Sequence, residues 1–432
     1  MGTARFKKIL ITTTGLFVFT TCIYAGEQTP PQMNLPECIG YAIKNQIDVF
    51  SGHIALSNAK ADMKKAKSEY MPIVSVGYSE NRYDPDQISL QNKTVDEEQM
   101  NISVGLNIYN SGAKRLNLQS ARAAYAYSNY SETRIKQTTA YKVTSCYLRL
   151  LQTKKLAEIQ TARVKMLEEQ LEMVRSGIAA GMDAEIDALP IEAQLSNAKV
   201  DELSAANAIL AASVDLQNAM GIKVSDEFSV SDIEDRNQTD IMPFEYYEQS
   251  AHKNRTDIQG AREYSQMYMK TKQIAKIQLR PHLLTNASFN QEVGSVKTDV
   301  FNITAGVYYD IYDGGKNLKN YQIATNNYLY AEAKREQLEK DILSDVRKAY
   351  FDLIDSSSRL EAGSLSYDAA IRNYDMQQAR FREGLSVTLD LLNAQYELVS
   401  AQNNVAKARY DFLQAQALME YVTGTWGKPN EN

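Results

Sequence analysis

Residues 109–117 read YNSGAKRLN and residues 312–320 read YDGGKNLKN, and the two stretches are copies of one another. A shift of 203 positions aligns them, and the alignment runs on without a gap to residues 221 and 424. Identical pairs along it include Tyr109 and Tyr312, Gly112 and Gly315, Tyr147 and Tyr350, Gly181 and Gly384, Asp187 and Asp390, and Gly221 and Gly424. This period is far longer than that of a solenoid or a propeller, so the chain contains one large unit twice.

The unit extends further toward the N-terminus with a change of register. Ala42, Lys44, Asn45, Asp48 and Pro72 match Ala251, Lys253, Asn254, Asp257 and Pro281, now 209 positions apart. The six-residue difference must be absorbed between Pro72 and Tyr109. Loops absorb insertions at little cost in free energy, so we expect a longer loop there in the first copy.

Residues 1–25 are typical of a secretory signal peptide, with three basic residues, an apolar run over 9–19 and expected cleavage after Ala25. Lipidation of Cys22 is an alternative, although residues 19–21 fit such a site poorly. Removing the peptide takes away three of the 47 basic residues and none of the 53 acidic ones, which leaves a net charge of −9. That charge argues against nucleic acid as a partner.

The chemistry-bearing residues are few and scattered. Only Cys38 and Cys146 remain after export, and we expect them to be unpaired, since a disulfide-stapled protein would have more. His53, His252 and His282 lie far apart, and none stands at ligand spacing from a cysteine or a carboxylate pair. We therefore expect no metal site, no catalytic triad and no cofactor, and the chain is not expected to be an enzyme.

Two alternating segments in each copy predict β-strands. In residues 101–108, Ile102, Val104, Leu106 and Ile108 share one face, and Ser103, Gly105 and Asn107 share the other. In the second copy, Phe301, Ile303, Ala305, Val307, Tyr309 and Ile311 form the apolar face. The partner strands are expected over about 73–82 and 283–292. Strands of about ten residues have the length that a tilted transmembrane strand needs.

The strand pattern alone also fits a soluble hairpin with one buried face. However, the chain is expected to be exported, and nothing else in each copy offers these strands a core. Four strands cannot close a barrel, and a closed barrel is the only sheet that spans a membrane. Several chains must therefore pool their strands, and three chains would supply twelve.

The rest of each copy is predicted to be helical. A first helical pattern covers 39–69 and 246–278 and ends before a proline. Long pairs of antiparallel helices follow at 113–176 with 184–219 and at 316–380 with 386–422, the longer ones roughly 95 Å in length. The expected organisation is a signal peptide at 1–25, a first repeat at 26–221 with a hairpin at 73–109, a linker at 222–243, a second repeat at 244–424 with a hairpin at 282–312, and a tail at 425–432.

This order of features resembles the TolC family of outer-membrane channels. The residues that carry the resemblance are the strand end at 312–315, the helix-turn run RFREGLSVTLDLLNA at 380–394, Ala408-Arg409-Tyr410 and Val422-Thr423-Gly424. The resemblance implies a homotrimer in the outer membrane of a Gram-negative bacterium, with a twelve-stranded β-barrel in the lipid and a periplasmic α-barrel of coiled-coil helices. It also implies a periplasmic adaptor protein and an inner-membrane transporter of the RND, ABC or MFS type as partners.

The resemblance assigns roles at the helix turns. Gly181 and Met182, with Gly384 and Leu385, correspond to the adaptor docking turns. Asp390 corresponds to an aspartate that rings the pore constriction, with Asn393 one turn on and Asp187 at the equivalent place in the first copy. Carboxylates near a helix start are also favoured by the helix dipole, so both aspartates have a second interpretation as helix-start charges.

The contacts that lock the closed tip in familiar members involve a tyrosine and an arginine bonded to an aspartate. Here those positions hold Phe381, Ser386 and Asp187, so the aspartate is present without its partners. Arg380 and Arg382 are candidates to replace them.

The sequence therefore indicates an efflux exit duct. The outer-membrane component of type I protein secretion is an alternative that the sequence does not separate from it. A lipid-anchored coiled-coil envelope scaffold is more remote, since a scaffold has no reason to keep alternating strands. An exported hydrolase would need a clustered nucleophile and base, which the scattered histidines do not provide.

Overall fold

The computed structural model describes residues 32–83, 95–181, 184–225, 228–233, 241–293 and 298–426. The expected signal peptide with Cys22, the docking residue Met182 and most of the tail at 425–432 lie outside these ranges.

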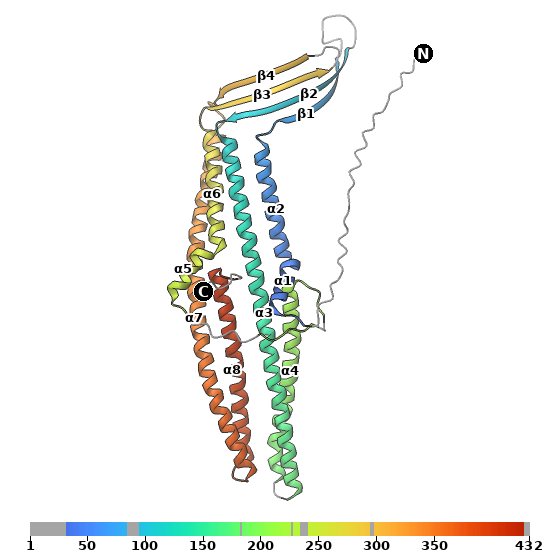
Figure 1. Cartoon of the computed structure of the whole chain (residues 1–432), viewed down its shortest axis with the longest axis vertical. Coiled ribbons are helices and arrows are strands. Elements are labelled where there is room, and N and C mark those ends of the chain that lie inside the picture. The colour runs from blue at the N-terminus through green and yellow to red at the C-terminus, as the bar shows by residue number, and fades with distance from the viewer. Residues whose placement is uncertain are drawn as a thin grey trace, which may run out of the picture.

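The chain is built from long helices that stand below one curved sheet (Figure 1). The first copy contains α1 (Leu35–Asn45), α2 (Ile47–Ser68), β1 (Ile73–Tyr83), β2 (Val95–Asn110), α3 (Ala113–Ala179), a 3-10 turn (Glu185–Asp187) and α4 (Ala188–Met220). The second contains α5 (Phe244–Asn254), α6 (Thr256–Ile277), β3 (His282–Val293), β4 (Thr298–Tyr308), α7 (Lys316–Arg382) and α8 (Thr388–Thr423). Eleven residues separate β1 from β2 and four separate β3 from β4, which agrees with the longer connection expected in the first copy.

The first helical pattern of each copy is two helices, not one. The chain leaves the helical conformation at Gln46, with ψ of 130°, and at Arg255, with ψ of 116°. Both residues send their side chains to the end of another helix, so contacts from elsewhere in the fold decide the break. The expectation of continuous helices over 39–69 and 246–278 was wrong for this reason.

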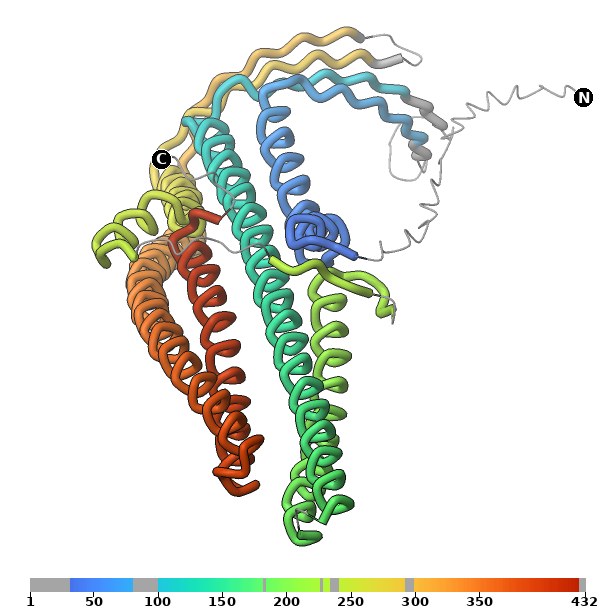
Figure 2. Tube along the Cα trace, turned by 60° about the horizontal axis from the view of Figure 1, so that its bottom comes forward, coloured from blue at the N-terminus to red at the C-terminus, as the bar shows by residue number. Residues whose placement is uncertain are grey.

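The four strands form one antiparallel sheet in the order β1-β2-β3-β4, which arches over the helices (Figure 2). Its register places one apolar side chain from every strand in a single row, namely Val74, Val104, Phe289 and Phe301. Ser75, Ser103 and Asn290 form part of the neighbouring row, on the other face. Val300, opposite Asn290, completes that row, so the alternation in the sequence becomes one apolar and one mainly polar face, as predicted.

Strand β4 ends earlier than the alternation suggested. Its last paired residue is Tyr308, which lies opposite His282, the first residue of β3. Pro281 precedes that residue, so β3 offers no partner to residues beyond 308. Tyr309 and Ile311 therefore lie outside the strand. The hairpin was expected to extend to residue 312, but it ends at Tyr308.

The turn from strand into long helix is the same in both copies. Gly112 and Gly315 precede the helices with φ of +84° and +82°. The Asn110 side chain accepts a hydrogen bond from the Lys114 backbone N–H, and the Asp313 side chain accepts from that of Asn317. These are equivalent positions, and each satisfies a donor that the helix start leaves free.

The helices form a curved row in which each packs on its neighbour. Nearer the sheet the order is α2, α3, α6, α7, and nearer the tips it is α4, α3, α8, α7. The two long helices, α3 and α7, of 67 residues each, run through both halves and are roughly 100 Å long. In the part of the chain that the structure describes, no helix is both long and apolar enough to cross a membrane.

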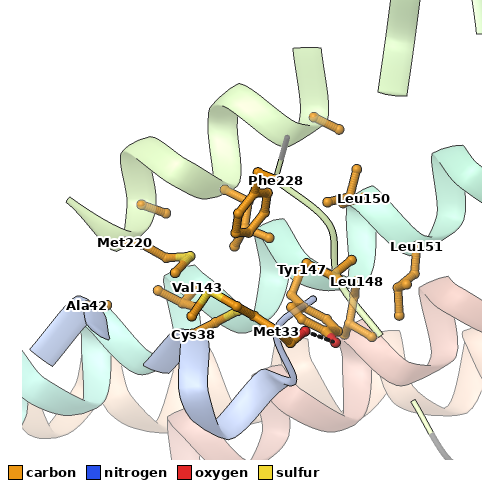
Figure 3. Packing of buried hydrophobic residues seen from close by; sticks show 14 of the residues in the cluster. Met33, Cys38, Ala42, Val143, Tyr147, Leu148, Leu150, Leu151, Met220 and Phe228 are labelled. Carbon is orange, nitrogen blue, oxygen red and sulfur yellow. Dashed lines mark hydrogen bonds between the residues drawn. The ribbon is translucent and has the colours of Figure 1, made fainter. Parts of the chain in front are cut away.

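The largest apolar core lies where α1 and the inter-repeat linker meet α3 and α4 (Figure 3). Met33 pairs with Val230 of the linker, and the Tyr147 hydroxyl donates a hydrogen bond to the Met33 carbonyl at 3.3 Å. Cys38 is buried in this core, where burial raises the pKa of its thiol to about 12. Cys38 and Cys146 are both unpaired, as expected.

Candidate functional site: helix tips and equatorial junctions

The tip of the second hairpin is a tight turn closed by backbone hydrogen bonds. Gly384 has φ of +72°, its N–H donates to the Phe381 carbonyl at 3.0 Å, and the Leu385 N–H donates to the Arg380 carbonyl at 2.8 Å. This is a helix stop of the Schellman type, which satisfies the last carbonyls of α7. It leaves the Leu385 side chain 64% exposed at the tip.

Asp390 and Asn393 lie in the first turns of α8, and both are exposed. The Ser386 hydroxyl lies 3.3 Å from one Asp390 carboxylate oxygen and 3.3 Å from the Gln377 side-chain oxygen, and it shares its single proton between these two acceptors. Ser386 thus connects the end of α7 to the start of α8, and Asp390 has a local role at the helix start.

The first hairpin turns at Gly181, with φ of +72°. The Asp187 carboxylate accepts a hydrogen bond from the Ala184 N–H at 3.2 Å, so this aspartate also supports its own turn. Both hairpin tips lie at the end of the molecule opposite the sheet (Figure 1). The structure places both aspartates at these tips, and a further role for them in a pore constriction stays a prediction.

Phe381 has a packing role at the tip. It is half-buried against the apolar cluster of α3 and α4 around Leu171 and Ile191, to which Leu392 of α8 also belongs. It therefore connects the two hairpins through apolar contact. Arg380 and Arg382 are exposed, and the Asp187 carboxylate binds the Ala184 N–H rather than either arginine in the described part of the chain.

Two polar sites halfway along the molecule were not predicted from the sequence. At the first junction, the break residue Gln46 donates from its side-chain nitrogen to the carbonyls of Asn218 and Ala219, at 2.7 and 2.6 Å. These are among the last carbonyls of α4, which have no partner within their own helix. Gln46 therefore joins the end of α4 to the start of α2.

At the second junction the equivalent residue is Arg255, and it joins α8 to α6. Its Nη1 donates to the Val422 carbonyl at 3.3 Å, and its Nε and Nη2 donate to the two Asp257 carboxylate oxygens at 3.0 and 2.5 Å. The fork of the guanidinium thus binds the carboxylate through two parallel bonds. The side chain of Arg255 is only 5% exposed.

Arg134 of α3 adds a second cation to this junction. Its Nη1 donates to the Tyr421 carbonyl at 3.1 Å, and its Nε lies 3.6 Å from an Asp257 oxygen. The two arginines hold the pKa of the Asp257 carboxyl below its ordinary value despite burial, which acts in the opposite direction. Burial and the neighbouring Arg255 lower the pKa of Arg134.

Each junction includes a glycine that follows the capped helix. A Cβ on Gly221 would lie 3.2 Å from the Asn45 backbone, and a Cβ on Gly424 would lie 3.0 Å from that of Asn254. Gly221 and Gly424 have φ of +69° and +71°, and both were visible as an identical pair in the repeat alignment. Gln46 and Arg255 correspond at the same offset of 209 positions, but the alignment does not say which helix end they contact.

A cavity of about 730 Å³ lies beside the second junction. Residues of α2, α3, α6 and α7 all line it. Its lining includes Asp48, Arg134, Asp257, Tyr264 and Asp341. No group of three or more His, Cys, Asp or Glu side chains that could hold a metal ion is found among the described residues.

Long paired helices below a curved sheet with an apolar face define a class, the outer-membrane channels with a helical periplasmic extension. The chain belongs to the outer membrane efflux protein family, whose model matches residues 38–222 and 248–425. The two matched segments correspond to the two copies of the repeat.

Individual proteins of this class are distant in sequence and similar in fold. The chain is 23% identical to the alkaline protease secretion protein AprF of Pseudomonas aeruginosa over 340 residues, 73% of this chain and 70% of that protein. It is 22% identical to the outer membrane protein TolC of Vibrio cholerae over 418 residues, 91% of each. The solved channel OprN superimposes with a TM-score of 0.76 and 17% identity over 90% of this chain and 89% of that one. The CmeC channel of Campylobacter jejuni gives 0.79 and 15% over 90% and 85%.

Membership of the family establishes the general function. The chain is an outer-membrane channel protein with a large periplasmic helical part. The family consists of channels, which are not enzymes. TolC-like outer-membrane factors form trimers and work with adaptor proteins and inner-membrane transporters.

Proposed function

We propose that three copies of this chain form the exit duct of a tripartite efflux pump, with no catalysis of its own. The observation that carries the proposal is the apolar row across all four strands. Val74 and Phe301 in this row are 66% and 64% exposed, and Phe289 is 36% exposed. Such a surface is stable in lipid rather than in water.

The free edges of the sheet support the number of copies. In the part of the chain that the structure describes, β2 pairs with β3, whereas β1 and β4 each pair with one strand. If β4 of one chain pairs with β1 of the next chain, the contact has the same form as that between β2 and β3. A ring of three chains then closes a barrel of twelve strands. Closure satisfies the backbone groups that hydrocarbon cannot.

The hairpin tips provide the periplasmic end of the duct. Gly181 and Met182 in one turn, and Gly384 and Leu385 in the other, are the proposed docking positions for a periplasmic adaptor. The exposed Leu385 offers an apolar contact there. The adaptor would connect the duct to an inner-membrane transporter, which supplies the energy for export.

The first helical turns after the tips are the proposed constriction. Asp187, Asp390 and Asn393 of three chains would converge where the tube narrows. Converging carboxylates focus negative potential, which attracts cations.

Protein secretion is the second candidate. Two of the similar proteins are named for it, the alkaline protease secretion protein of Pseudomonas aeruginosa and the proteases secretion protein PrtF of Dickeya chrysanthemi. Both uses require the same passive duct, and the transporter selects the cargo.

Two measurements test the proposal. The mass of detergent-extracted protein should equal three chains, and the purified protein should produce discrete conductance steps in a planar bilayer. A water-soluble monomer without conductance would contradict the proposal. Deleting the gene in its native cell separates the two candidates. A rise in drug accumulation would support efflux, and a loss of protease export would support protein secretion.

A further inference from the structure

The repeat allows the contacts inside one chain to be mapped onto contacts between chains. Inside the chain, α3 of the first copy packs against α6 and α8 of the second; we name this the internal seam. Among the described residues, no helix packs in this way on the other side of the equivalent helix α7. In the proposed ring, α7 would pack against α2 and α4 of the next chain, which we name the external seam. The inference below rests on that proposed ring.

The apolar half of the external seam is exposed in the single chain. In the internal seam, Leu148 and Leu151 of α3 are 3% and 5% exposed and belong to a cluster that includes Leu413 of α8. Their equivalents on α7, Phe351 and Ile354, are 62% and 39% exposed. The equivalent of Leu413 is Leu210 of α4, which is 61% exposed.

These matched apolar surfaces identify the occupant of the seam as a second copy of the chain. Phe351 and Ile354 have the chemistry of the leucines that they replace, and Leu210 is identical to its counterpart. The external seam can therefore bury apolar surface in the same way as the internal one.

The polar half of the seam differs between the two copies. The internal seam is bridged by Arg134, which reaches from α3 to Asp257 of α6 and to the Tyr421 carbonyl of α8. The equivalent of Arg134 on α7 is Gln337, an exposed residue whose side chain donates to Asp341 at 2.8 Å. The equivalent of Asp257 is Asp48, which is also exposed.

The carbonyl acceptor differs as well. Tyr421 corresponds to Asn218, and the carbonyl of Asn218 already accepts from Gln46 of its own copy. At the first junction the donors to the Asn218 carbonyl, the Gln46 side chain and the Gly221 N–H, therefore both come from the same copy. The second junction takes a donor from across the internal seam.

We propose that the external seams lack the arginine lock of the internal seam, so that Asp48 of one chain lies opposite Gln337 of the next and the seams between chains are the weaker joints of the assembled tube. In detergent, the chains should then separate from one another before the two copies within a chain do.

The test installs the missing cation. Gln337→Arg should pair with Asp48 of the next chain and lower the dissociation constant of the detergent-solubilised trimer, by roughly 1.5- to 5-fold per seam, the range of an exposed ion pair. Gln337→Met is the matched control without charge and should give no such gain. An arginine at 337 would also lie one helical turn from Asp341, so both variants are repeated in an Asp48→Asn background, where the gain should disappear.

The outcomes separate the inference from the proposed function. If the wild-type protein is not a trimer, the proposed duct is wrong. If it is a trimer and Gln337→Arg dissociates like Gln337→Met, the missing lock is not what limits the seam. A gain that persists with Asp48→Asn would show that the two residues do not face each other.

Cross-linking supplies a measurement that does not depend on stability. Asp48 and Gln337 of one chain also line the same cavity, so a link within a chain does not count as support. Asp48→Cys combined with Gln337→Cys should give covalent dimers and trimers with a short bifunctional thiol reagent. Either single variant should remain monomeric on a denaturing gel. Failure of the double variant to cross-link in an intact trimer would overturn the proposed register.

Discussion

The guanidinium carbon of Arg134 lies 4.0 Å from the centroid of the Tyr421 ring, and the same side chain donates to the Tyr421 carbonyl. The Tyr421 ring is stacked on Tyr141, with centroids 4.7 Å apart. One arginine from the first copy thus contacts the ring and the backbone at the end of α8. This cation–π contact and the charge-assisted hydrogen bond join the two copies at one point.

Replacing Arg134 by the residue at the equivalent position of the other copy tests this joint. Arg134→Gln should lower the free energy of unfolding by about 1–3 kcal/mol, because a nearly buried charge-assisted hydrogen bond is lost. Urea unfolding in detergent measures it. Arg115→Gln, at an exposed position of the same helix, should change it by less than about 0.5 kcal/mol. Equal effects would contradict a special role for Arg134.

Asp257 should make the protein sensitive to acid. Its pKa in the folded state lies below the ordinary value of 3.8, so its contribution to stability is present above that value and is lost as the pH falls through the folded-state pKa. Unfolding curves recorded over a pH series should therefore show a smaller loss at low pH for Asp257→Asn than for wild type. Asp48→Asn, the exposed equivalent, should keep the wild-type acid dependence. If both variants behave alike, the pairing of Asp257 with the arginines does not determine how the free energy of unfolding falls at low pH.

A methyl group at either junction glycine should be costly. Gly424→Ala places a Cβ 3.0 Å from the Asn254 backbone and requires a left-handed conformation as well. Gly112→Ala has the same conformational requirement, but no atom lies within 4 Å of the added carbon. We expect Gly112→Ala to cost about 1–2 kcal/mol and Gly424→Ala to cost more, as measured by thermal unfolding. The reverse order would argue against close packing at the junction.

The faces of the sheet can be tested by charge insertion. Leu106→Arg should destabilise the inserted protein by about 2–4 kcal/mol if the residue faces lipid near the bilayer midplane. Ser103→Arg, on the opposite face of the same strand, should cost much less. Folding into liposomes of defined composition, followed on heat-modifiable gels, reports both values. Similar losses at the two positions would refute the assignment.

The proposed constriction is tested by its charge. Asp390→Ala should reduce cation selectivity and weaken block by trivalent cations in single-channel recordings, because three carboxylates leave the narrowest part of the tube. Asn393→Asp is the complementary variant and should increase both. Unchanged selectivity in both variants would mean that Asp390 serves only the start of α8, where Ser386 holds it.

The architecture could be predicted from the sequence because its signals are local and occur twice. Alternation at 101–108 and the turn glycines at 112 and 315 each specify one element, and the structure has those elements in place. The polar junctions could not be predicted in the same way. Gln46 and Arg255 interrupt a helical pattern because of helix ends that lie about 170 residues away along the chain.

The tip shows the same limit on a smaller scale. The positions of Gly384 and Asp390 followed from the sequence, because turn glycines and helix-start acids act on their own neighbours. The packing of Phe381 against α3 and α4 did not follow, since it depends on where the other hairpin lies. The resemblance implied contacts of a tyrosine and an arginine with an aspartate at the tip, and it did not predict an apolar contact at Phe381.

The junctions at Gln46 and Arg255 also divide the tube mechanically. Helices α3 and α7 are each continuous, so each transmits a force from the tip to the sheet through a single helix. The other two columns of helix are α4 followed by α2, and α8 followed by α6. In each, the force must pass through a junction between two separate helices. Two of the four columns can therefore change direction at the joints without breaking a helix, while α3 and α7 connect tip and sheet through continuous helix.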